Sequence, residues 1–392
     1  MTLLSSIVRS LVVVAMVLLA RPEFAAAEII DLAPDLSPVR EEFQFPALGA
    51  AVIVEGRLHA LGVVGVRKYD SEVKAEPNDA FHLGSCTKAM TGSLIGLLVE
   101  QGKLKWDTPL IEYFPEMKDT MHPDYRQVTL VHLLSHRAGV PPMTAGFGPA
   151  TPLQLLEIRM MQSPVEQRKR IAEIVLTQGP VNKPGEKCEY SNAGFAIAGA
   201  IAERVMGESY EDLLTRMLFE PLGMKTAGFG AMGTPGQADA QRPFEPRALW
   251  QHRMDGDKII PIEPGPLADN PPFLTPGGRV HCSMADWARY VQCVLAAARG
   301  ETSLLPASCV EQLKQAPFGG EYALGWGLCN RDWAGGTALS HGGSNTMNYS
   351  IVWLAPRKDF AVLVATNRGG DGAAEGLDKL CGLLIKKFLA GT

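Results

Sequence analysis

The hydrophobic pattern of this 392-residue chain changes period twice, and this change limits the folds that the chain can adopt. Two apolar segments between residues 48 and 66 flank the turn at residues 55–57, which predicts a β-hairpin. Residues 349–354 and 360–366 form a second pair of β-rich runs. The long region between the two pairs has the apolar spacing of helices. We therefore expect an α/β (α+β) fold: one antiparallel sheet from both ends of the chain, flanked by helices, plus a mostly helical insert lobe.

The chain is expected to form one catalytic domain, residues 28–392, with two lobes. We assign residues 28–84 and 276–392 to the sheet lobe and residues 85–275 to the helical lobe. Within this region residues 261–278 are half proline or glycine, which predicts an ordered loop or lid and no regular element.

Residues 1–27 have the pattern of a signal peptide. Arg9 precedes an apolar run at residues 11–20, and the small residues 25–27 offer a cleavage site. The run is about ten residues long, which is too short to span a bilayer comfortably. An uncleaved anchor is the alternative. We expect cleavage near Ala27 and export to the periplasm or the medium, with no stable membrane anchor afterwards.

Charge and cysteine content restrict the partners. A net charge of −5 gives no reason to expect nucleic acid binding. The seven cysteines are an odd number without regular spacing, so buried thiols are favoured over disulfides. Cys86 differs, because its place beside a candidate nucleophile would make it open to modification.

The motif Ser-Cys-Thr-Lys at residues 85–88 stands where a polar turn enters an apolar helix. Ser85 and Lys88 share one helix face, which places an amine beside a hydroxyl, and a serine needs such a base before it attacks a carbonyl. The first turn also offers unpaired N–H groups to an oxyanion. The same spacing at Ser71 and Lys74 lies in a charged stretch without helical period. The alternative interpretation is a helix cap beside a solvated lysine.

Two further motifs carry chemistry. Tyr190 and Asn192 lie on a turn before a helix, where a tyrosine hydroxyl can relay protons and an amide can both donate and accept. His341 supplies a titratable ring, and the glycines after it let a substrate approach the backbone that leads to the Ser344 N–H. Each motif alone is also compatible with an ordinary turn or strand entry.

No metal or other cofactor is expected. His132 and His136 have a spacing that can bind zinc, but no glutamate follows His132 and no third ligand is evident. No serine has glycine two residues before and two after it, which argues against a nucleophile elbow of the α/β-hydrolase type.

The three motifs, in this order, resemble those of the serine β-lactamase and penicillin-binding-protein superfamily. The similarity is greatest to the branch that contains class C β-lactamases, D-alanyl-D-alanine carboxypeptidases and related esterases. Other stretches also look like signatures of this superfamily, and together they cover most of the chain from about residue 48 to residue 367. They are residues 81–85, 102–107, 133–136, 184–186, 221–224 and 276–278.

The resemblance implies an acyl-enzyme mechanism without a metal. Ser85 would attack the carbonyl after losing its proton to neutral Lys88. Tyr190 would relay a proton to the leaving group and help to activate the deacylating water, and Asn192 would orient Lys88 and the substrate. The N–H groups of Ser85 and Ser344 would stabilise the oxyanion.

One departure from the superfamily concerns the substrate. The third motif usually has Lys or His, then Thr or Ser, then Gly, but this chain has Gly342 between His341 and Gly343. The hydroxyl that would bind a substrate carboxylate is therefore absent, and His341 is a weaker cation than lysine. We expect esterase-type hydrolysis of a small-molecule ester or amide. The alternatives are a β-lactamase, a D,D-carboxypeptidase or D-aminopeptidase acting on lactams or cell-wall peptides, and a non-catalytic binding protein on the same scaffold.

Overall fold

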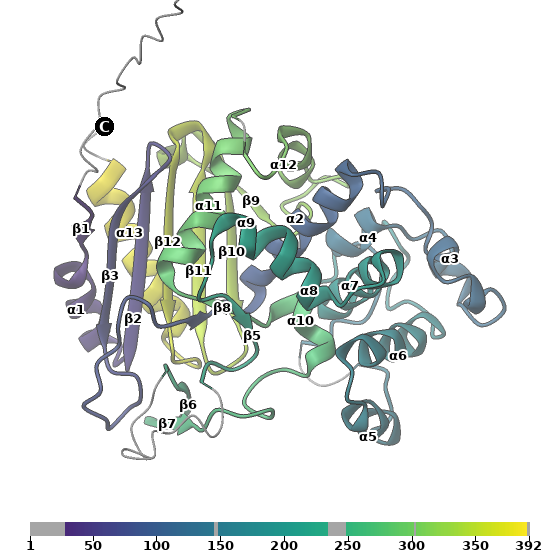
Figure 1. Cartoon of the computed structure of the whole chain (residues 1–392), viewed down its shortest axis with the longest axis horizontal. Coiled ribbons are helices and arrows are strands. Elements are labelled where there is room, and N and C mark those ends of the chain that lie inside the picture. Colours follow the sequence, from purple (N-terminus) through teal and green to yellow (C-terminus); the bar gives the residue numbers. More distant parts are fainter. Residues whose placement is uncertain (1–27, 145–147, 234–247, 302, 390–392) are drawn as a thin grey trace, which may run out of the picture.

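A mixed sheet built from both ends of the chain organises the molecule (Figure 1). The computed structural model describes residues 28–144, 148–233, 248–301 and 303–389; the expected signal peptide lies outside these residues. Within them, one seven-stranded sheet has the order β1-β3-β2-β12-β11-β10-β9, antiparallel except for the β1–β3 pair. The expected pairing of N- and C-terminal segments, through β2 and β12, is thus confirmed. The strands are β1 (Ile30–Asp31), β2 (Ala47–Val54), β3 (Arg57–Gly65), β9 (Gly327–Arg331), β10 (Gly336–Ser344), β11 (Tyr349–Ala355) and β12 (Phe360–Thr366).

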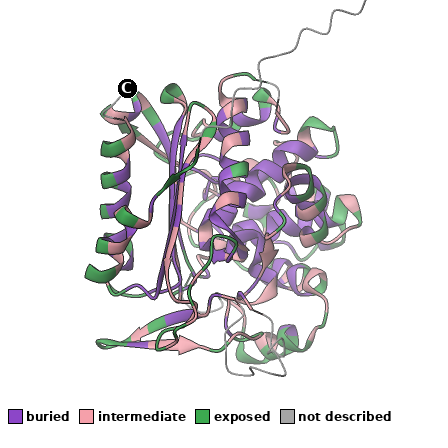
Figure 2. Ribbon diagram, turned by 60° about the vertical axis from the view of Figure 1, so that its left-hand side comes forward, coloured by how far each residue is buried: buried purple, intermediate pink, exposed green. Residues whose placement is uncertain are grey.

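Helices cover both faces of this sheet, which lies edge-on between them in Figure 2. Side chains alternate along β2, so Leu48 and Ala50 join one apolar core while Ala51 and Ile53 join the other. The central strand β12 is buried along its whole length, as expected for a strand covered on both faces. The covering helices are α1 (Ala33–Glu42) and α13 (Ala373–Leu389) on one side, and α11 (Met284–Ala298) on the other. Helix α12 (Ala307–Leu313) packs against α11 and α2.

The helical part surrounds α2 (Thr87–Glu100), which is buried on nearly every side. Most of α2 is apolar, and its polar Lys88, Thr91 and Ser93 are hydrogen-bonded inside the protein. The helix therefore packs in the centre of the lobe and presents no polar face to water. Its neighbours include α7, α10 and α12. The remaining helices are α3 (Leu110–Tyr113), α4 (Leu130–Leu134), α5 (Pro152–Met160), α6 (Pro164–Leu176), α7 (Asn192–Met206), α8 (Tyr210–Leu214), α9 (Glu220–Leu222) and α10 (Thr275–Gly278).

Two small sheets lie beside the main one. One has the order β4-β8-β5, and β6 pairs with β7 in the other. The expectation that residues 261–278 form no regular element is wrong at both ends, because β7 extends to Ile262 and α10 begins at Thr275. Proline is compatible with the first turn of a helix, since it lacks only an N–H that would have no partner there. The strands are β4 (Phe81–His82), β5 (Gly228–Phe229), β6 (Gln251–Asp255), β7 (Lys258–Ile262) and β8 (Val280–Cys282).

All seven cysteines are free, and most are buried, as expected from their spacing. The suggestion that Cys86 is open to modification is wrong. Its thiol is fully buried, and burial raises its pKa to about 12. In the part of the chain that the structure describes, every helix is too short or too polar to cross a membrane.

Candidate active site

Ser85 lies at the junction of the main sheet and the helical lobe. Strand β4 leads into a short 3₁₀ turn, Gly84–Cys86, from which α2 continues. Ser85 is half-buried, whereas the residues on both sides of it are buried. Gly84 has φ +50°, a conformation that residues with a side chain rarely adopt, so the turn needs glycine here.

Lys88 lies one helical turn beyond Ser85 and is fully buried. Its Nζ atom is 3.1 Å from Ser85 Oγ, 2.7 Å from Asn192 Oδ1 and 2.5 Å from the carbonyl oxygen of Gly277. The structure therefore brings together the first two predicted motifs and a third segment, α10.

These contacts determine what neutral Lys88 does. The two carbonyl oxygens, of Asn192 and Gly277, can only accept hydrogen bonds, so they take the two N–H groups of a neutral amine. The remaining lone pair is then directed at Ser85 Oγ and can accept its proton. Burial lowers the pKa of Lys88 to about 7, so a large fraction of the amine is neutral at physiological pH.

The low pKa of Lys88 predicts a rise in activity with pH. Protonated Lys88 has no lone pair, so kcat/KM for an uncharged ester should increase about tenfold per pH unit below the Lys88 pKa of about 7 and level off above it. Initial rates measured from about pH 5 to about pH 9 check this. A rate that falls between about pH 6 and about pH 8 would contradict the assignment of Lys88 as the base.

Tyr190 lies over the same cluster. Its ring centroid is 4.8 Å from Lys88 Nζ. Burial raises the pKa of Tyr190 well above its usual value, although the nearby Ser85 hydroxyl acts in the opposite direction. Tyr190 is therefore protonated at neutral pH, which suits a group that passes on a proton and not the initial base.

Asn192 is the first residue of α7, and the helix positions it firmly. The preceding Ser191 is the N-cap, with its Oγ accepting the Gly194 N–H at 3.1 Å. The Asn192 amide group donates to the carbonyl oxygen of Met143 at 3.1 Å, which leaves its Oδ1 directed at Lys88.

The third motif forms the end of β10 and packs on the Ser85 turn. A Cβ atom built on Gly343 would lie 2.0 Å from the carbonyl oxygen of Leu83 and 2.8 Å from the Ser85 nitrogen. A Cβ atom on Gly84 would lie 2.4 Å from the Ser344 nitrogen. Only glycine at both positions permits this close contact between the end of β10 and the Ser85 turn. The contact brings the backbone nitrogens of Ser85 and Ser344 near each other.

His341 does not provide a positive charge. It is buried, its Nε2 lies 2.9 Å from the hydroxyl of Tyr322, and its Nδ1 lies 2.7 Å from the carbonyl oxygen of Gly342. Burial, and then the charge of Lys88, lower the pKa of His341 to about 3. The sequence suggested a weaker cation than lysine at His341, and the buried ring is uncharged at neutral pH. Both ring nitrogens contact neighbouring groups.

Three residues that contact the side chains around Ser85 and Lys88, or support them, were not given a role at this site from the sequence. The Gly277 carbonyl belongs to a recognised signature, residues 276–278, but its contact with Lys88 depends on the fold. The His136 ring contacts the rings of Tyr190 and Tyr322 in tilted arrangements, with centroid distances of 4.4 and 4.5 Å. Tyr322 had no sequence signal, because it lies in a segment without a motif and contacts the site only through its hydrogen bond to His341 and its ring contact with His136.

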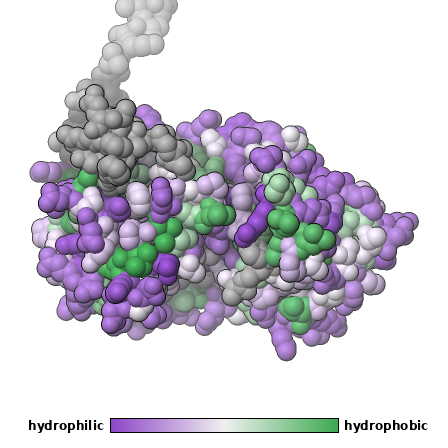
Figure 3. All heavy atoms as spheres, turned by 90° about the horizontal axis from the view of Figure 1, so that it is seen from below, coloured by the Kyte–Doolittle hydropathy of each residue, from purple (hydrophilic) through white to green (hydrophobic). Residues whose placement is uncertain are grey.

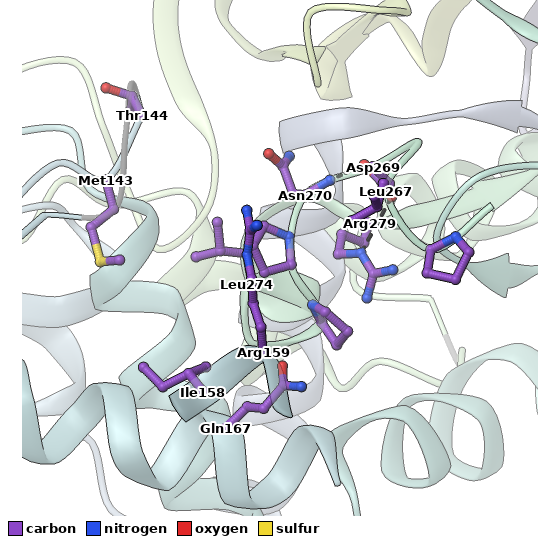
Figure 4. A pocket seen from close by; sticks show the side chains of 13 residues that line it. Met143, Thr144, Ile158, Arg159, Gln167, Leu267, Asp269, Asn270, Leu274 and Arg279 are labelled. Atoms are coloured by element: carbon purple, nitrogen blue, oxygen red, sulfur yellow. Dashed lines mark hydrogen bonds and ion pairs between the residues drawn. The ribbon is translucent and has the colours of Figure 1, made fainter. Parts of the chain in front are cut away.

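A cavity of about 470 Å³ lies among helices α5 and α6 and the segment before α10 (Figure 4). Met143, whose carbonyl binds Asn192, lines one wall, and Leu274, just before α10, lines another. Its other lining side chains include the apolar Ile158, Leu267 and several prolines, together with the charged Arg159, Asp269 and Arg279. Seen from below, hydrophobic side chains also gather over the α5 region (Figure 3). Exposed ones there include Leu153, Leu156 and Met160.

The profile of the Beta-lactamase family matches residues 34–380. The chain therefore belongs to the Beta-lactamase family, as its motifs indicated, and is a serine hydrolase with an acyl-enzyme mechanism.

Its similarity to individual proteins is modest in identity and extensive in length. Penicillin-binding protein 4 of Amycolatopsis lactamdurans is 27% identical over 344 residues, which cover 84% of this chain and 83% of that protein. Protein flp of Staphylococcus aureus (strain MRSA252) is 22% identical over 330 residues, which cover 82% of this chain but 59% of flp.

Solved structures share the fold. The octameric penicillin-binding protein homologue from Pyrococcus abyssi has a TM-score of 0.71 at 24% identity, covering 92% of this chain and 77% of that chain. A D-stereospecific amidohydrolase from Streptomyces sp. has a TM-score of 0.64 at 19% identity, covering 86% and 94%.

Proposed function

We propose that this protein is an exported serine hydrolase that forms its acyl-enzyme at Ser85 and hydrolyses small esters or amides, esters above all. The observation that carries the proposal is the contact of Lys88 Nζ with Ser85 Oγ at 3.1 Å, combined with two carbonyl acceptors for its protons. A hydroxyl beside a neutral buried amine is an activated nucleophile.

In the proposed reaction, neutral Lys88 takes the proton of Ser85 as Oγ attacks the substrate carbonyl. The N–H groups of Ser85 and Ser344 stabilise the oxyanion, a contribution of about 3 kcal/mol per donor. Tyr190, which is protonated at neutral pH and lies beside Lys88, passes a proton to the leaving group. The same groups then assist attack of water on the acyl-enzyme.

The preference for esters rests on the groups near the third motif. Gly342 has no hydroxyl, and His341 is uncharged at neutral pH because its pKa is about 3. Neither therefore offers a strong site for a substrate carboxylate. We assign the apolar part of the substrate to the cavity that Met143 lines, because the Met143 carbonyl also binds Asn192. The apolar side chains in its wall favour an apolar acyl or alcohol group.

A substrate panel tests this specificity. We expect kcat/KM for p-nitrophenyl esters of short and medium apolar acids to exceed that for a chromogenic cephalosporin or a D-Ala-D-Ala peptide by about 100-fold or more, equivalent to about 3 kcal/mol of transition-state stabilisation. Faster cephalosporin turnover would favour a β-lactamase, and faster peptide turnover a D,D-carboxypeptidase or D-aminopeptidase. Failure of a fluorophosphonate probe to label the folded protein would favour a non-catalytic binding protein.

A further inference from the structure

Asp269 is a buried carboxylate that the proposed reaction leaves without a role. It lies in the segment between β7 and α10 and its side chain is 1% exposed. Its Oδ2 accepts hydrogen bonds from His82 Nε2 at 2.9 Å and Arg279 Nε at 3.3 Å. Its Oδ1 accepts from Asn345 Nδ2 and the Asn270 N–H, at 2.9 and 2.8 Å. All four neighbours donate hydrogen bonds, so the side chain at this position needs two atoms that both accept.

The His82 bond connects Asp269 to the nucleophile turn. His82 is the last residue of β4, and its Nδ1 accepts the Gly84 N–H at 3.1 Å. Because Nδ1 accepts a hydrogen bond, the ring proton is on Nε2, and this N–H donates to Asp269. The carboxylate thus fixes the ring that holds Gly84, the residue directly before Ser85.

The Asn345 bond connects Asp269 to the end of β10. Asn345 follows Ser344 and is 5% exposed. Its amide also donates to Gln251 Oε1 at 2.7 Å, and its Oδ1 accepts the Met347 N–H at 3.2 Å. These bonds anchor the loop after β10.

The Arg279 bond connects Asp269 to α10. Arg279 directly follows this helix, whose Gly277 carbonyl accepts from Lys88. The Arg279 guanidinium also donates to Thr275 Oγ1 at 3.2 Å. Although burial alone would raise the pKa of Asp269, His82 and Arg279 lower it to about 2, so the group is a carboxylate at neutral pH.

We propose that Asp269 is a positioning residue that sets the separation of the two oxyanion-stabilising N–H groups. One oxygen holds the turn that carries the Ser85 nitrogen, through His82, and the other holds the strand end that carries the Ser344 nitrogen, through Asn345. This inference rests on the proposed roles of Ser85 and Ser344. It adds that their alignment depends on a carboxylate from a third segment of the chain.

Asp269→Asn is the sharpest test, because it changes two acceptors into one acceptor and one donor. In either amide orientation an N–H faces existing donors. A change of tautomer at His82 does not remove the conflict, since Nδ1–H would then oppose the Gly84 N–H. The substitution is nearly isosteric, so it disturbs the bonds more than the packing.

The readout is the ratio of oxoester to thionoester turnover. The thiocarbonyl sulfur is a longer, weaker hydrogen-bond acceptor, so this ratio reports oxyanion stabilisation directly. We expect Asp269→Asn to lower kcat for an oxoester by about 10- to 100-fold, less than complete loss of one oxyanion donor. KM should change by less than about threefold, and the oxoester/thionoester ratio should fall by about tenfold.

Asp286→Asn is the matched control. Asp286 is also buried and accepts two hydrogen bonds, from the backbone and hydroxyl groups of Thr226, at the start of α11. It should lower the melting temperature without changing the ratio. If Asp269→Asn fails to fold, His82→Asn gives the same test. The amide oxygen of the new asparagine can still accept the Gly84 N–H, while the bond to Asp269 is lost.

Three results separate the possibilities. A lowered ratio in the Asp269 or His82 variant, with an unchanged ratio in Asp286→Asn, supports the proposal. An unchanged ratio in folded Asp269→Asn overturns it, whether or not stability falls. Ester turnover that survives Ser85→Ala would overturn the proposed function itself, and this inference with it.

Discussion

Ser85→Ala should abolish acyl-enzyme formation and lower ester turnover by about four orders of magnitude or more, as loss of a catalytic serine does elsewhere. The substitution removes the attacking oxygen and leaves no other hydroxyl against Lys88 among its described hydrogen-bond partners. Because Ser85 is half-buried and small, we expect the free energy of unfolding to change by less than about 1 kcal/mol. Intact mass after treatment with a fluorophosphonate, together with ester turnover and thermal melting, measures these effects.

Ser71→Ala is the matched control, since Ser71 begins the second Ser-x-x-Lys of the chain. Its Oγ accepts the Val73 N–H at 3.1 Å in a surface loop, away from any helix start. This variant should retain labelling and turnover. If Ser71→Ala lost the label and Ser85→Ala kept it, the nucleophile would be assigned to the wrong motif.

Lys88→Ala should lower kcat/KM by about three orders of magnitude or more, because the proton of Ser85 then has no acceptor. Its effect and that of Ser85→Ala should not add in the double variant, since the two side chains act as a unit. Rates of fluorophosphonate labelling for the single and double variants measure this. Near-normal turnover in Lys88→Ala would show that another group is the base.

The structure adds one part to this expectation. Lys88 is fully buried, so its removal should also affect the stability of the fold. Its removal leaves the carbonyl oxygens of Asn192 and Gly277 without this donor, which costs about 1–3 kcal/mol for each unsatisfied group. Lys88→Met preserves most of the volume and separates packing from chemistry. Lys74→Ala, in the exposed second copy, should change neither stability nor turnover.

Local signals account for several elements. The hairpin turn at residues 55–57 was predicted from them, and the helix starts after Thr129, Ser209 and Ser283 depend on bonds between residues a few positions apart. The π-helical segment Thr215–Phe219, between α8 and α9, had no such signal. The short helix α10 was missed because its proline and two glycines are typical of loops, and only packing against α2 and α7 favours the helix.

The sequence by itself determined the order of the three motifs, the family to which they belong, and the residue types available for acyl transfer. Only the tertiary structure decided their protonation states and contacts. Lys88 meets Asn192 and Gly277 across 104 and 189 residues of chain, and Asp269 meets His82 across 187. Burial, which lowers the pKa of Lys88 and leaves His341 neutral, results from the packing of whole elements. No pattern of neighbouring residues encodes it, because desolvation depends on everything that surrounds a side chain in space.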